Sequence, residues 1–298
     1  MNIAFLSDIC LNAEGSGGGY IHASQVAGRL LKHGHRLYTN LQGESESFVK
    51  YSVPEFVRKG REIAVFYVRI DGWPGRDELT ALRQTNPYAL CVWEVNSPLE
   101  ELRTRGIAEV ELEQLKRRRR ALARMVDAAV CVSEEMQEYA RDELGIKRTY
   151  VIPNGSDPEL FSPGKRDVNV YNSERYTVLY SASFGYKWQN LETVQALADA
   201  IRRAGHHDII IAATAQGTSS DDLVYLGQMS YLEMPRYMAS ADVGLCLYDK
   251  FDFYKKFYGS PTKLYDYMAC GLPVIGTNVG QIKSVTESVG SGVVPMGT

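Results

Sequence analysis

The sequence predicts an α/β protein made of two doubly wound domains, each with a parallel sheet between layers of helices. Apolar extended stretches alternate with amphipathic helical stretches along almost the whole chain, and this alternation is typical of parallel sheets. At 298 residues the chain is also long for a single core. A polar stretch with Pro and Gly at 161–176 separates two rounds of the alternation, so we predict domains at residues 1–163 and 176–298.

The first domain begins with a strand-like stretch at 2–9 and a glycine-rich loop at 15–20. A helix is predicted at 21–35, where apolar residues recur at helical spacing, and extended character resumes at 36–41. A strand, a helix and a second strand in this order form the unit from which parallel sheets are built. Further strands are predicted from the short apolar runs at 63–70, 88–95, 128–133 and 150–155.

The second domain repeats the alternation after the linker. Helices are predicted at 190–205 and 231–241. A last helix and strand occupy 260–275, "SPTKLYDYMACGLPVI". The strands between the helices are predicted at 177–183, 208–214, 222–227 and 243–248.

Composition and charge are those of a globular protein in an aqueous compartment. Hydrophobic residues make up 45% of the chain and charged residues 23%, and the net charge of −3 gives no general attraction to nucleic acid. The N-terminus lacks a basic region before its apolar stretch, so it does not resemble a signal peptide. No stretch approaches the roughly 20 apolar residues of a membrane span. We therefore expect a cytoplasmic protein.

The five cysteines are scattered, and each has apolar neighbours. None forms a Cys-x-x-Cys or Cys/His pair at zinc spacing, and the five histidines show no metal-binding spacing with carboxylates. We therefore expect reduced core thiols, no metal site and no cofactor. The cysteines stand at positions 10, 91, 131, 246 and 270.

The stretch at 260–275 predicts a binding site for an anion of phosphate size. Ser260 is a good N-cap, and Pro261 fits the first helical position because it has no N–H to leave unpaired. Gly271 is suited to end the helix. A helix N-terminus carries unpaired N–H groups and a partial positive charge, to which Lys263 adds, and Asp266 could accept hydrogen bonds from a ribose diol. The apolar side of the helix is predicted at Leu264, Met268 and Ala269.

Two strand ends of the first domain carry candidate sugar- or acceptor-binding residues. Gly17, Gly18 and Gly19 precede a helix, where backbone without Cβ atoms can approach a ligand; a mobile connection is the alternative. Their spacing is not Gly-x-Gly-x-x-Gly, so a dinucleotide site is not supported. Glu94 and Asn96 end a hydrophobic strand, and the carboxyl ends of strands line the ligand crevice of open α/β sheets. The alternative is that Glu94 pairs with a nearby arginine and Asn96 caps the next helix.

Two basic features have both a structural and a functional interpretation. The run from Lys116 to Arg120 lies on a predicted helix with an apolar stripe, which favours a solvated helix face. Peripheral docking on an anionic membrane surface is the alternative. Lys187 follows the first strand of the second domain, so its ammonium is either a surface charge or a cation in the ligand crevice.

Taken together, these motifs resemble the family 4 glycosyltransferases, the "group 1" class with the GT-B fold of two Rossmann-like domains facing across a cleft. The stretch "GGGYIHASQVAGRLLKHGH" is similar to that family's glycine loop and first helix, and "VIPNGSDPELFSP" is similar to its segment before the linker. The stretches "VYLGQMSYLEMPRYMASADVGLCLY" and "SPTKLYDYMACGLPVIGTNVGQ" resemble its nucleotide-binding half. The resemblance spans nearly the whole chain.

The resemblance implies a retaining, metal-independent glycosyltransferase that uses a nucleoside-diphosphate sugar and a hydroxyl acceptor, either a glycan or a lipid-linked glycan. In such enzymes the departing diphosphate is thought to take the acceptor proton. Two lysines would stabilise the charge of that leaving group, Lys187 and Lys263. The base would lie against Leu226, Gly227 and Gln228, and the ribose against Asp266. The diphosphate would be cradled by Ser260, Pro261, Thr262 and Lys263.

The sequence departs from the family in three respects. The family usually has two glutamates eight positions apart, where this chain has Tyr258 and Asp266. The arginine and lysine that the family often places beside the diphosphate correspond here to Phe184 and Gln189, with Lys187 as the nearest substitute. Such chains usually continue for several tens of residues with a helix that returns to the first domain, so we expect either a truncated chain or a protein that lacks this closing helix.

Two alternatives keep the fold and change the function. One is a binding subunit that resembles a glycosyltransferase and has lost the chemistry at the altered positions. The other is a sugar-nucleotide epimerase of the same architecture, which turnover without an acceptor would distinguish.

Overall fold

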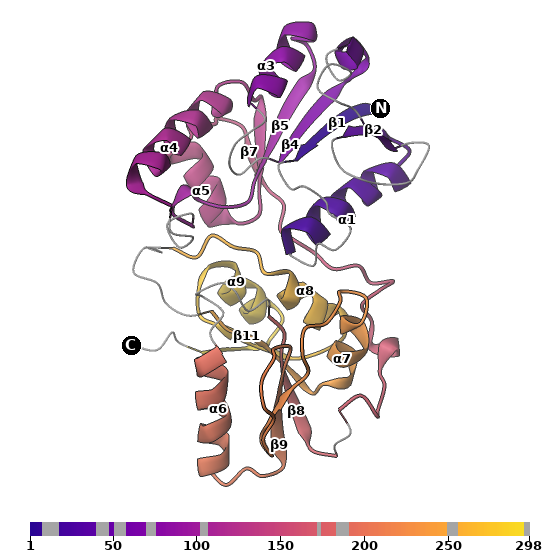
Figure 1. The fold of residues 1–298 in the computed structure, drawn as a ribbon, viewed down its shortest axis with the longest axis vertical. Coiled ribbons are helices and arrows are strands. Elements are labelled where there is room, and N and C mark those ends of the chain that lie inside the picture. The colour runs from indigo at the N-terminus through magenta and orange to yellow at the C-terminus, as the bar shows by residue number, and fades with distance from the viewer. Residues whose placement is uncertain are drawn as a thin grey trace. The chain divides into compact units, whose positions relative to one another are not determined.

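The structure is a computed structural model, and it describes residues 1–7, 18–39, 48–50, 58–69, 76–101, 107–171, 174–182, 191–248 and 256–294. The chain divides into two compact units, Met1–Pro153 and Asn154–Thr298. In each unit helices pack against a parallel sheet (Figure 1). The predicted α/β fold of two parallel-sheet, Rossmann-like domains is therefore confirmed.

The first domain is built on a sheet whose described strands have the order β3-β2-β1-β4-β5-β6-β7, and neighbouring strands pair in parallel. The chain adds strands outward from β1 and then continues from β4 in the opposite direction. The strand order therefore reverses between β1 and β4, which is where ligands of open α/β sheets bind. The elements are β1 (Asn2–Ser7), α1 (Gly18–Lys32), β2 (Arg36–Thr39), β3 (Phe48–Lys50), β4 (Val65–Arg69), α3 (Arg76–Thr85), β5 (Leu90–Val95), α4 (Glu109–Ala123), β6 (Ala128–Cys131), α5 (Glu134–Asp142) and β7 (Thr149–Val151).

The second domain has the same plan. Its described strands have the order β10-β9-β8-β11-β12-β13, again parallel, and the order reverses between β8 and β11. The elements are β8 (Tyr176–Tyr180), α6 (Leu191–Arg203), β9 (Ile209–Ala213), β10 (Leu223–Tyr225), α7 (Met234–Ser240), β11 (Val243–Cys246), α8 (Thr262–Ala269), β12 (Val274–Thr277), α9 (Gly280–Ser288) and β13 (Gly292–Val294).

Helix α1 is held on the first sheet by small residues. Ala23 and Ala27 lie one turn apart and are buried against Ile3, Phe5 and Leu37 of strands β1 and β2. Short side chains at this spacing bring the helix close to the strands. The start of α1 is thereby fixed near the reversal of the strand order.

The division between the domains falls earlier than the sequence predicts. Phe161, which we expected in the first domain, is fully buried in a core cluster with Leu264 and Tyr267 of helix α8. Its ring centroid lies 5.1 Å from that of Tyr231, also in the second unit. Residues 154–163 therefore fold with the second domain.

Buried thiols are found where the sequence predicts them. Within the described residues Cys91, Cys131, Cys246 and Cys270 are buried and free, and Cys10 lies outside those residues. None of the described helices is long and apolar enough to cross a membrane.

A close approach between strand β11 and helix α8 fixes the second core. A Cβ atom at Gly244 would lie 2.6 Å from the ring of the fully buried Tyr267. The ring is held by its hydroxyl, which accepts a hydrogen bond from the Ser181 N–H at 2.8 Å and donates one to the Leu179 carbonyl at 3.2 Å. Only glycine at position 244 leaves room for this ring.

Replacing Gly244 with alanine should destabilise the second domain. Because the tyrosine ring cannot move without losing its hydrogen bonds, we expect Gly244→Ala to lower the free energy of unfolding by about 1–3 kcal/mol in urea denaturation. The control is Gly164→Ala in the same unit, where the nearest atom to a new Cβ would be 3.9 Å away, and it should unfold like the parent. Equal stability of the two variants would contradict the close packing of α8 on β11.

Candidate functional site

Helix α8 begins at Thr262 with Pro261 as its N-cap, and among the described residues no side chain caps it. The prediction of Ser260 as the N-cap is wrong, because its Oγ accepts a hydrogen bond from the Asn154 backbone N–H at 3.0 Å. The Asn154 side chain also donates to the Ser260 carbonyl at 2.5 Å. Ser260 therefore ties the start of α8 to the first residue of the second domain, and the first N–H groups of α8 keep no side-chain cap.

The buried face of α8 carries two charged side chains. Lys263, Leu264, Asp266 and Tyr267 are its buried residues, and spacings of three and four place them on one side of the helix. Of the predicted apolar side Leu264 is fully buried, and Met268 and Ala269 are partly buried and pack against the same core cluster, which Tyr267 also joins. Lys263 precedes Tyr267 by four positions and is therefore turned inward with it. The helix ends as predicted, at Gly271, with φ of 79°.

The ammonium of Lys263 is buried between two aromatic rings. Its Nζ lies 4.8 Å from the ring centroid of Tyr180 and 5.3 Å from that of Tyr248, a cation–π arrangement. This atom has no hydrogen-bond partner in the part of the chain that the structure describes. Burial lowers the pKa of Lys263 to about 8. The side chain is therefore mostly charged at neutral pH, in a place where its charge is costly.

Asp266 is buried on the same face of the helix. Its side chain is 3% exposed, and the Ser156 hydroxyl donates to its Oδ1 at 2.5 Å. Burial raises the pKa of the Asp266 carboxyl to about 7, while the hydrogen bond from Ser156 opposes that rise. The carboxyl is therefore only partly ionised at neutral pH. Additional hydrogen-bond donors from a ligand would favour its charged form.

The ammonium of Lys263 lies at the reversal of the second sheet. Tyr180 ends β8 and Tyr248 follows β11, and these are the two strands between which the order reverses. Lys263 rests on both tyrosines, so its ammonium lies at the carboxyl edge of the sheet where a ligand is expected. Lys187 was predicted for the same edge and lies outside the described residues.

The predicted base-binding residues follow β10, at the edge of the sheet. Leu226 packs against the core cluster that contains Leu264. Gly227 has φ of 77°, which favours glycine, and its N–H donates to the Ala215 carbonyl at 2.9 Å. Gln228 is exposed. The structure therefore joins Leu226 to the core beneath α8 and leaves the Gln228 side chain at the surface.

Glu94 is the centre of a hydrogen-bonded cluster in the first domain. Its Oε1 lies 2.7 Å from His22 Nε2 and accepts hydrogen bonds from Arg69 Nε at 3.0 Å and Asn96 Nδ2 at 2.8 Å. The Tyr67 hydroxyl donates to its Oε2 at 2.5 Å. Glu94 is 1% exposed. The carboxylate that we predicted to contact a sugar is thus surrounded by protein donors.

The cluster keeps Glu94 ionised. Burial alone would raise the pKa of this carboxyl, but the hydrogen bond and charge of His22, the charge of Arg69 and the Tyr67 hydroxyl together lower it to about 2. Burial and the nearby carboxylate raise the pKa of Tyr67, which stays neutral. The expected pairing of Glu94 with an arginine is confirmed by Arg69, whereas Asn96 bonds to Glu94 and caps no described helix.

The sequence did not single out His22. Helix α1 begins at Gly18, so Gly18 and Gly19 form its first turn and not the predicted loop, and Gly17 lies outside the described residues. His22 is one turn further along α1. The available signal was Arg69, a charged residue that ends an apolar strand next to β1 and therefore needs a buried partner.

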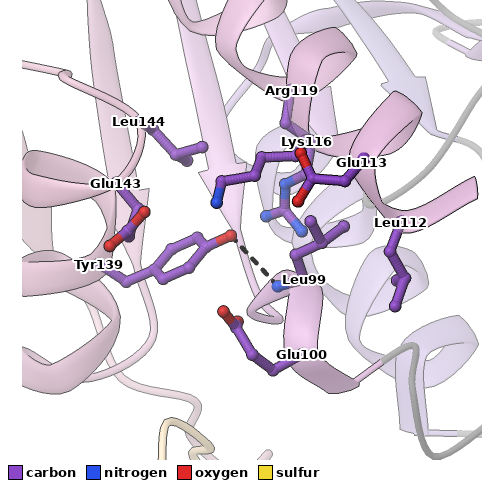
Figure 2. Close-up of a pocket in the computed structure, with 9 residues that line it drawn as sticks. All are labelled: Leu99, Glu100, Leu112, Glu113, Lys116, Arg119, Tyr139, Glu143 and Leu144. Carbon is purple, nitrogen blue, oxygen red and sulfur yellow. Dashed lines mark hydrogen bonds between the residues drawn. The ribbon is translucent and has the colours of Figure 1, made fainter. Parts of the chain in front are cut away.

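A small pocket of the first domain contains none of the predicted site residues. Its volume is about 40 Å³, enough for ordered water but far below the several hundred Å³ of a sugar or nucleotide site. In Figure 2 the Tyr139 hydroxyl accepts a hydrogen bond from the Leu99 N–H, at 3.2 Å. The described residues also hold no group of three His, Cys, Asp or Glu side chains that could bind a metal. The pocket is lined by Leu99, Glu100, Leu112, Glu113, Lys116, Arg119, Tyr139, Glu143 and Leu144.

Arg119, which lines this pocket, corrects the interpretation of the basic run at 116–120. It is 3% exposed, lies 5.5 Å from the Trp93 ring and 5.6 Å from the Tyr139 ring, and donates to the Ser97 carbonyl at 2.8 Å. The run is therefore not a uniform solvated helix face. Docking of its remaining members on a membrane stays a prediction.

Both halves of the chain match models of known families. Residues 175–295 match the model described as "Glycosyl transferases group 1", and residues 91–160 match "Glycosyltransferase Family 4". The chain is 24% identical over 193 residues to TuaH of Bacillus subtilis (strain 168), which is named as a teichuronic acid biosynthesis glycosyltransferase. That match covers 61% of this chain and 46% of TuaH, so the chain spans less than half of this relative. The predicted resemblance is confirmed.

Solved structures share the fold at low sequence identity. WaaG, a glycosyltransferase involved in lipopolysaccharide biosynthesis, has a TM-score of 0.63 and 14% identity, with 98% of this chain and 86% of that chain covered. A UDP-forming trehalose-phosphate synthase from Burkholderia xenovorans has a TM-score of 0.64 and 12% identity, with 99% and 87% covered. The pneumococcal O-GlcNAc transferase GtfA, solved with UDP and GlcNAc, has a TM-score of 0.54 and 13% identity, with 83% and 49% covered.

Replacing Asp266 with asparagine should change how stability depends on pH. Because the pKa of Asp266 is raised from 3.8 to about 7 on folding, its contribution to stability is complete below about pH 4 and is lost as the pH rises through 7. Asparagine can still accept the Ser156 hydrogen bond and never ionises. We expect the free energy of unfolding of Asp266→Asn to exceed that of the parent by on the order of 2–4 kcal/mol above pH 7, and by much less near pH 4.

The measurement is urea denaturation of parent and variant at several pH values. Asp199→Asn is the control, since Asp199 lies on α6 with its side chain 58% exposed, and it should leave the pH dependence unchanged. A constant difference between Asp266→Asn and the parent at every pH would show that the carboxyl is not shifted by burial.

Proposed function

Because the chain belongs to the group 1 (family 4) glycosyltransferases, we propose that it moves a sugar from a nucleoside-diphosphate sugar to a hydroxyl acceptor with retention of configuration. The bond between the anomeric carbon and the diphosphate breaks while the acceptor oxygen bonds to that carbon on the same face. The acceptor proton passes to an oxygen of the departing diphosphate. Neither a side-chain base nor a metal ion is required in this scheme.

The observation that carries the proposal is the ammonium of Lys263 at the start of α8, which has no hydrogen-bond partner among the residues that the structure describes. A buried charge without a counter-charge costs free energy, and proteins keep such charges mainly where a ligand supplies the opposite sign. The N–H groups at the start of α8 have no side-chain cap among the described residues and carry partial positive charge. A diphosphate at this end of the helix would compensate both.

The charge of the leaving group increases in the transition state. Lys263 is buried, so it would act through its field in a medium of low dielectric constant and would not need to touch the phosphate. Because the side chain is already held between two rings, little reorganisation is needed when charge develops. Lys187 is the proposed second cation at this site.

Asp266 is the proposed ribose contact. In the free protein Ser156 occupies one of its oxygens, and ribose hydroxyls would add donors that favour the ionised carboxylate. The diphosphate would contact Ser260, Pro261 and Thr262 at the start of the helix, and the base would lie near Leu226, Gly227 and Gln228. These contacts follow from the family resemblance.

The likeness to TuaH and WaaG supports an acceptor in cell-surface polysaccharide or glycoconjugate synthesis, since both are named for such pathways. The GtfA structure, which was solved with UDP, supports a nucleotide-containing donor for this chain. An acceptor linked to lipid would bring the protein to a membrane, and the exposed part of the basic run at 116–120 would favour an anionic surface there.

A binding subunit without turnover is the second candidate. It is favoured by Tyr258, which stands where the family usually has its first glutamate. Turnover decides between the two functions. We expect release of nucleoside diphosphate from one of a panel of UDP-, GDP-, ADP- and TDP-sugars, and the same rate after addition of EDTA. Binding of a nucleotide with no turnover of any donor would favour the binding subunit, and loss of the rate with EDTA would contradict the metal-independent scheme.

Replacing Lys263 with methionine should raise stability and weaken nucleotide binding. Methionine fills a similar space without a charge, so the free energy of unfolding should stay equal or rise by about 1–3 kcal/mol. In the parent, a nucleoside diphosphate at about 100 times its dissociation constant should add roughly 2.7 kcal/mol of stability. Thermal unfolding with UDP, GDP, ADP and TDP measures both effects, and Lys263→Met should bind the best of them at least about tenfold more weakly.

Lys283→Met is the matched control, because Lys283 lies on α9 of the same domain and is exposed. It should alter neither quantity. Unchanged nucleotide affinity in Lys263→Met, or no response of the parent to any of the four nucleotides, would contradict the proposed site.

A further inference from the structure

The histidine of the Glu94 cluster has one ring nitrogen that the described residues leave without a hydrogen bond. His22 Nε2 lies 2.7 Å from Glu94 Oε1, and no described residue is hydrogen-bonded to Nδ1. The His22 side chain is 20% exposed, whereas that of Glu94 is 2% exposed. Among the members of this cluster, His22 thus presents a ring edge to solvent while the carboxylate behind it is enclosed.

Glu94 fixes which nitrogen carries the proton. The carboxylate is ionised and can only accept hydrogen bonds, so the short contact requires a proton on Nε2. In the neutral ring Nδ1 therefore carries a lone pair and is a hydrogen-bond acceptor. Arg69 and Tyr67 hold the carboxylate from strand β4, so the imidazole is oriented by groups that are themselves fixed.

The location of His22 is that of a ligand-binding residue. Helix α1 follows β1, and Arg69 is the last residue of β4. These strands are the pair between which the order of the first sheet reverses, and their carboxyl ends border the crevice that such sheets use. The imidazole is held at that edge.

The charges of the cluster select the chemistry of the ligand. Glu94 and Arg69 are paired at 3.0 Å, so their charges cancel, and Tyr67 is neutral. Because Arg69 is paired with Glu94, it offers an anion no uncompensated charge, while a hydroxyl group would find an acceptor in Nδ1 of the neutral ring. The Asn96 side-chain amide donates a hydrogen bond to Glu94. Its carbonyl oxygen is therefore a second acceptor, oriented by the same carboxylate.

We infer that His22 binds a hydroxyl group of an uncharged sugar through Nδ1, and that Glu94 acts as a positioning residue that orients the imidazole. Two acceptors held by one carboxylate suit a pair of neighbouring hydroxyls. Under the proposed function this sugar is the acceptor of the transfer reaction. Its role as acceptor rests on that function, whereas its binding to His22 does not. No proton transfer to His22 is involved.

The test uses the whole chain labelled with 15N-histidine, and its probes are glucose, galactose, mannose and N-acetylglucosamine, each with its 6-phosphate. Long-range 1H–15N spectra report the tautomer and the Nδ1 resonance of His22. We expect the Nε2-protonated tautomer in the free protein and a shift of Nδ1 on addition of at least one uncharged sugar. The 6-phosphate of that sugar should bind no more tightly.

Two variants separate the ligand contact from the structural role. In His22→Gln the amide nitrogen can still donate to Glu94 while the acceptor at Nδ1 is lost, so the domain should stay folded and the affinity for that sugar should fall at least tenfold. His22→Asn places an amide near the Nδ1 position but loses the contact with Glu94, and it should retain more sugar binding than His22→Gln. Binding of nucleoside diphosphates should be unchanged in both.

The Nδ1-protonated tautomer, an Nδ1 resonance that none of the four sugars moves, or tighter binding of a 6-phosphate would each overturn the inference. Equal sugar affinity in parent and His22→Gln would do the same. Failure of every nucleotide to bind would overturn the proposed function and leave this sugar site standing, so the two failures are distinguishable.

Discussion

The packing of the Tyr267 ring on Gly244 fixes helix α8 against the second sheet, and the candidate nucleotide site depends on that contact. The Tyr267 hydroxyl is hydrogen-bonded to Leu179 in β8 and to Ser181 just after it. Gly244 in β11 has no side chain, so the ring can pack directly on the strand. Helical geometry then turns Lys263 and Asp266 into the core, because Lys263 precedes Tyr267 by four positions and Asp266 follows Lys263 by three. Two charged groups are buried as a consequence of one aromatic contact, and the shifted pKa values of both follow from that burial.

The two domains use the same strand order and place different chemistry at its reversal. In the second sheet the reversal between β8 and β11 holds an ammonium without a counter-charge in the described part of the chain, which suits a diphosphate. In the first sheet the reversal between β1 and β4 holds the paired charges of Glu94 and Arg69 and the acceptor atoms that Glu94 orients, which suit hydroxyl groups. This difference is what a transferase with a charged donor and a sugar acceptor requires.

The alternation of strands and helices along the chain could be predicted from the sequence, whereas the environment of the site residues could not. Alternation of apolar runs and amphipathic stretches depends on neighbours along the chain, and Gly271 ends α8 for an equally local reason. Ser260 looks like a helix cap in its local sequence, but its partner Asn154 is 106 positions away. Glu94 was recognised as a strand-end carboxylate, yet the groups that enclose it come from α1, from β4 and from Asn96, which follows β5. Long-range contacts of this kind decide whether a polar residue meets a ligand or the protein.

Under the proposed function Lys263 compensates the charge of a bound diphosphate. Proton uptake on binding of the nucleotide measures this compensation most directly. At about pH 8.5 part of the Lys263 population is neutral in the free protein, since burial lowers its pKa to about 8, and a nearby diphosphate should raise that pKa and draw a proton from the buffer. Calorimetric titration of the best-binding nucleoside diphosphate in two buffers of different ionisation enthalpy should therefore show uptake of a fraction of a proton. Lys263→Met should abolish most of it. Equal binding enthalpy in the two buffers for the parent, or the same proton uptake in Lys263→Met, would contradict the account.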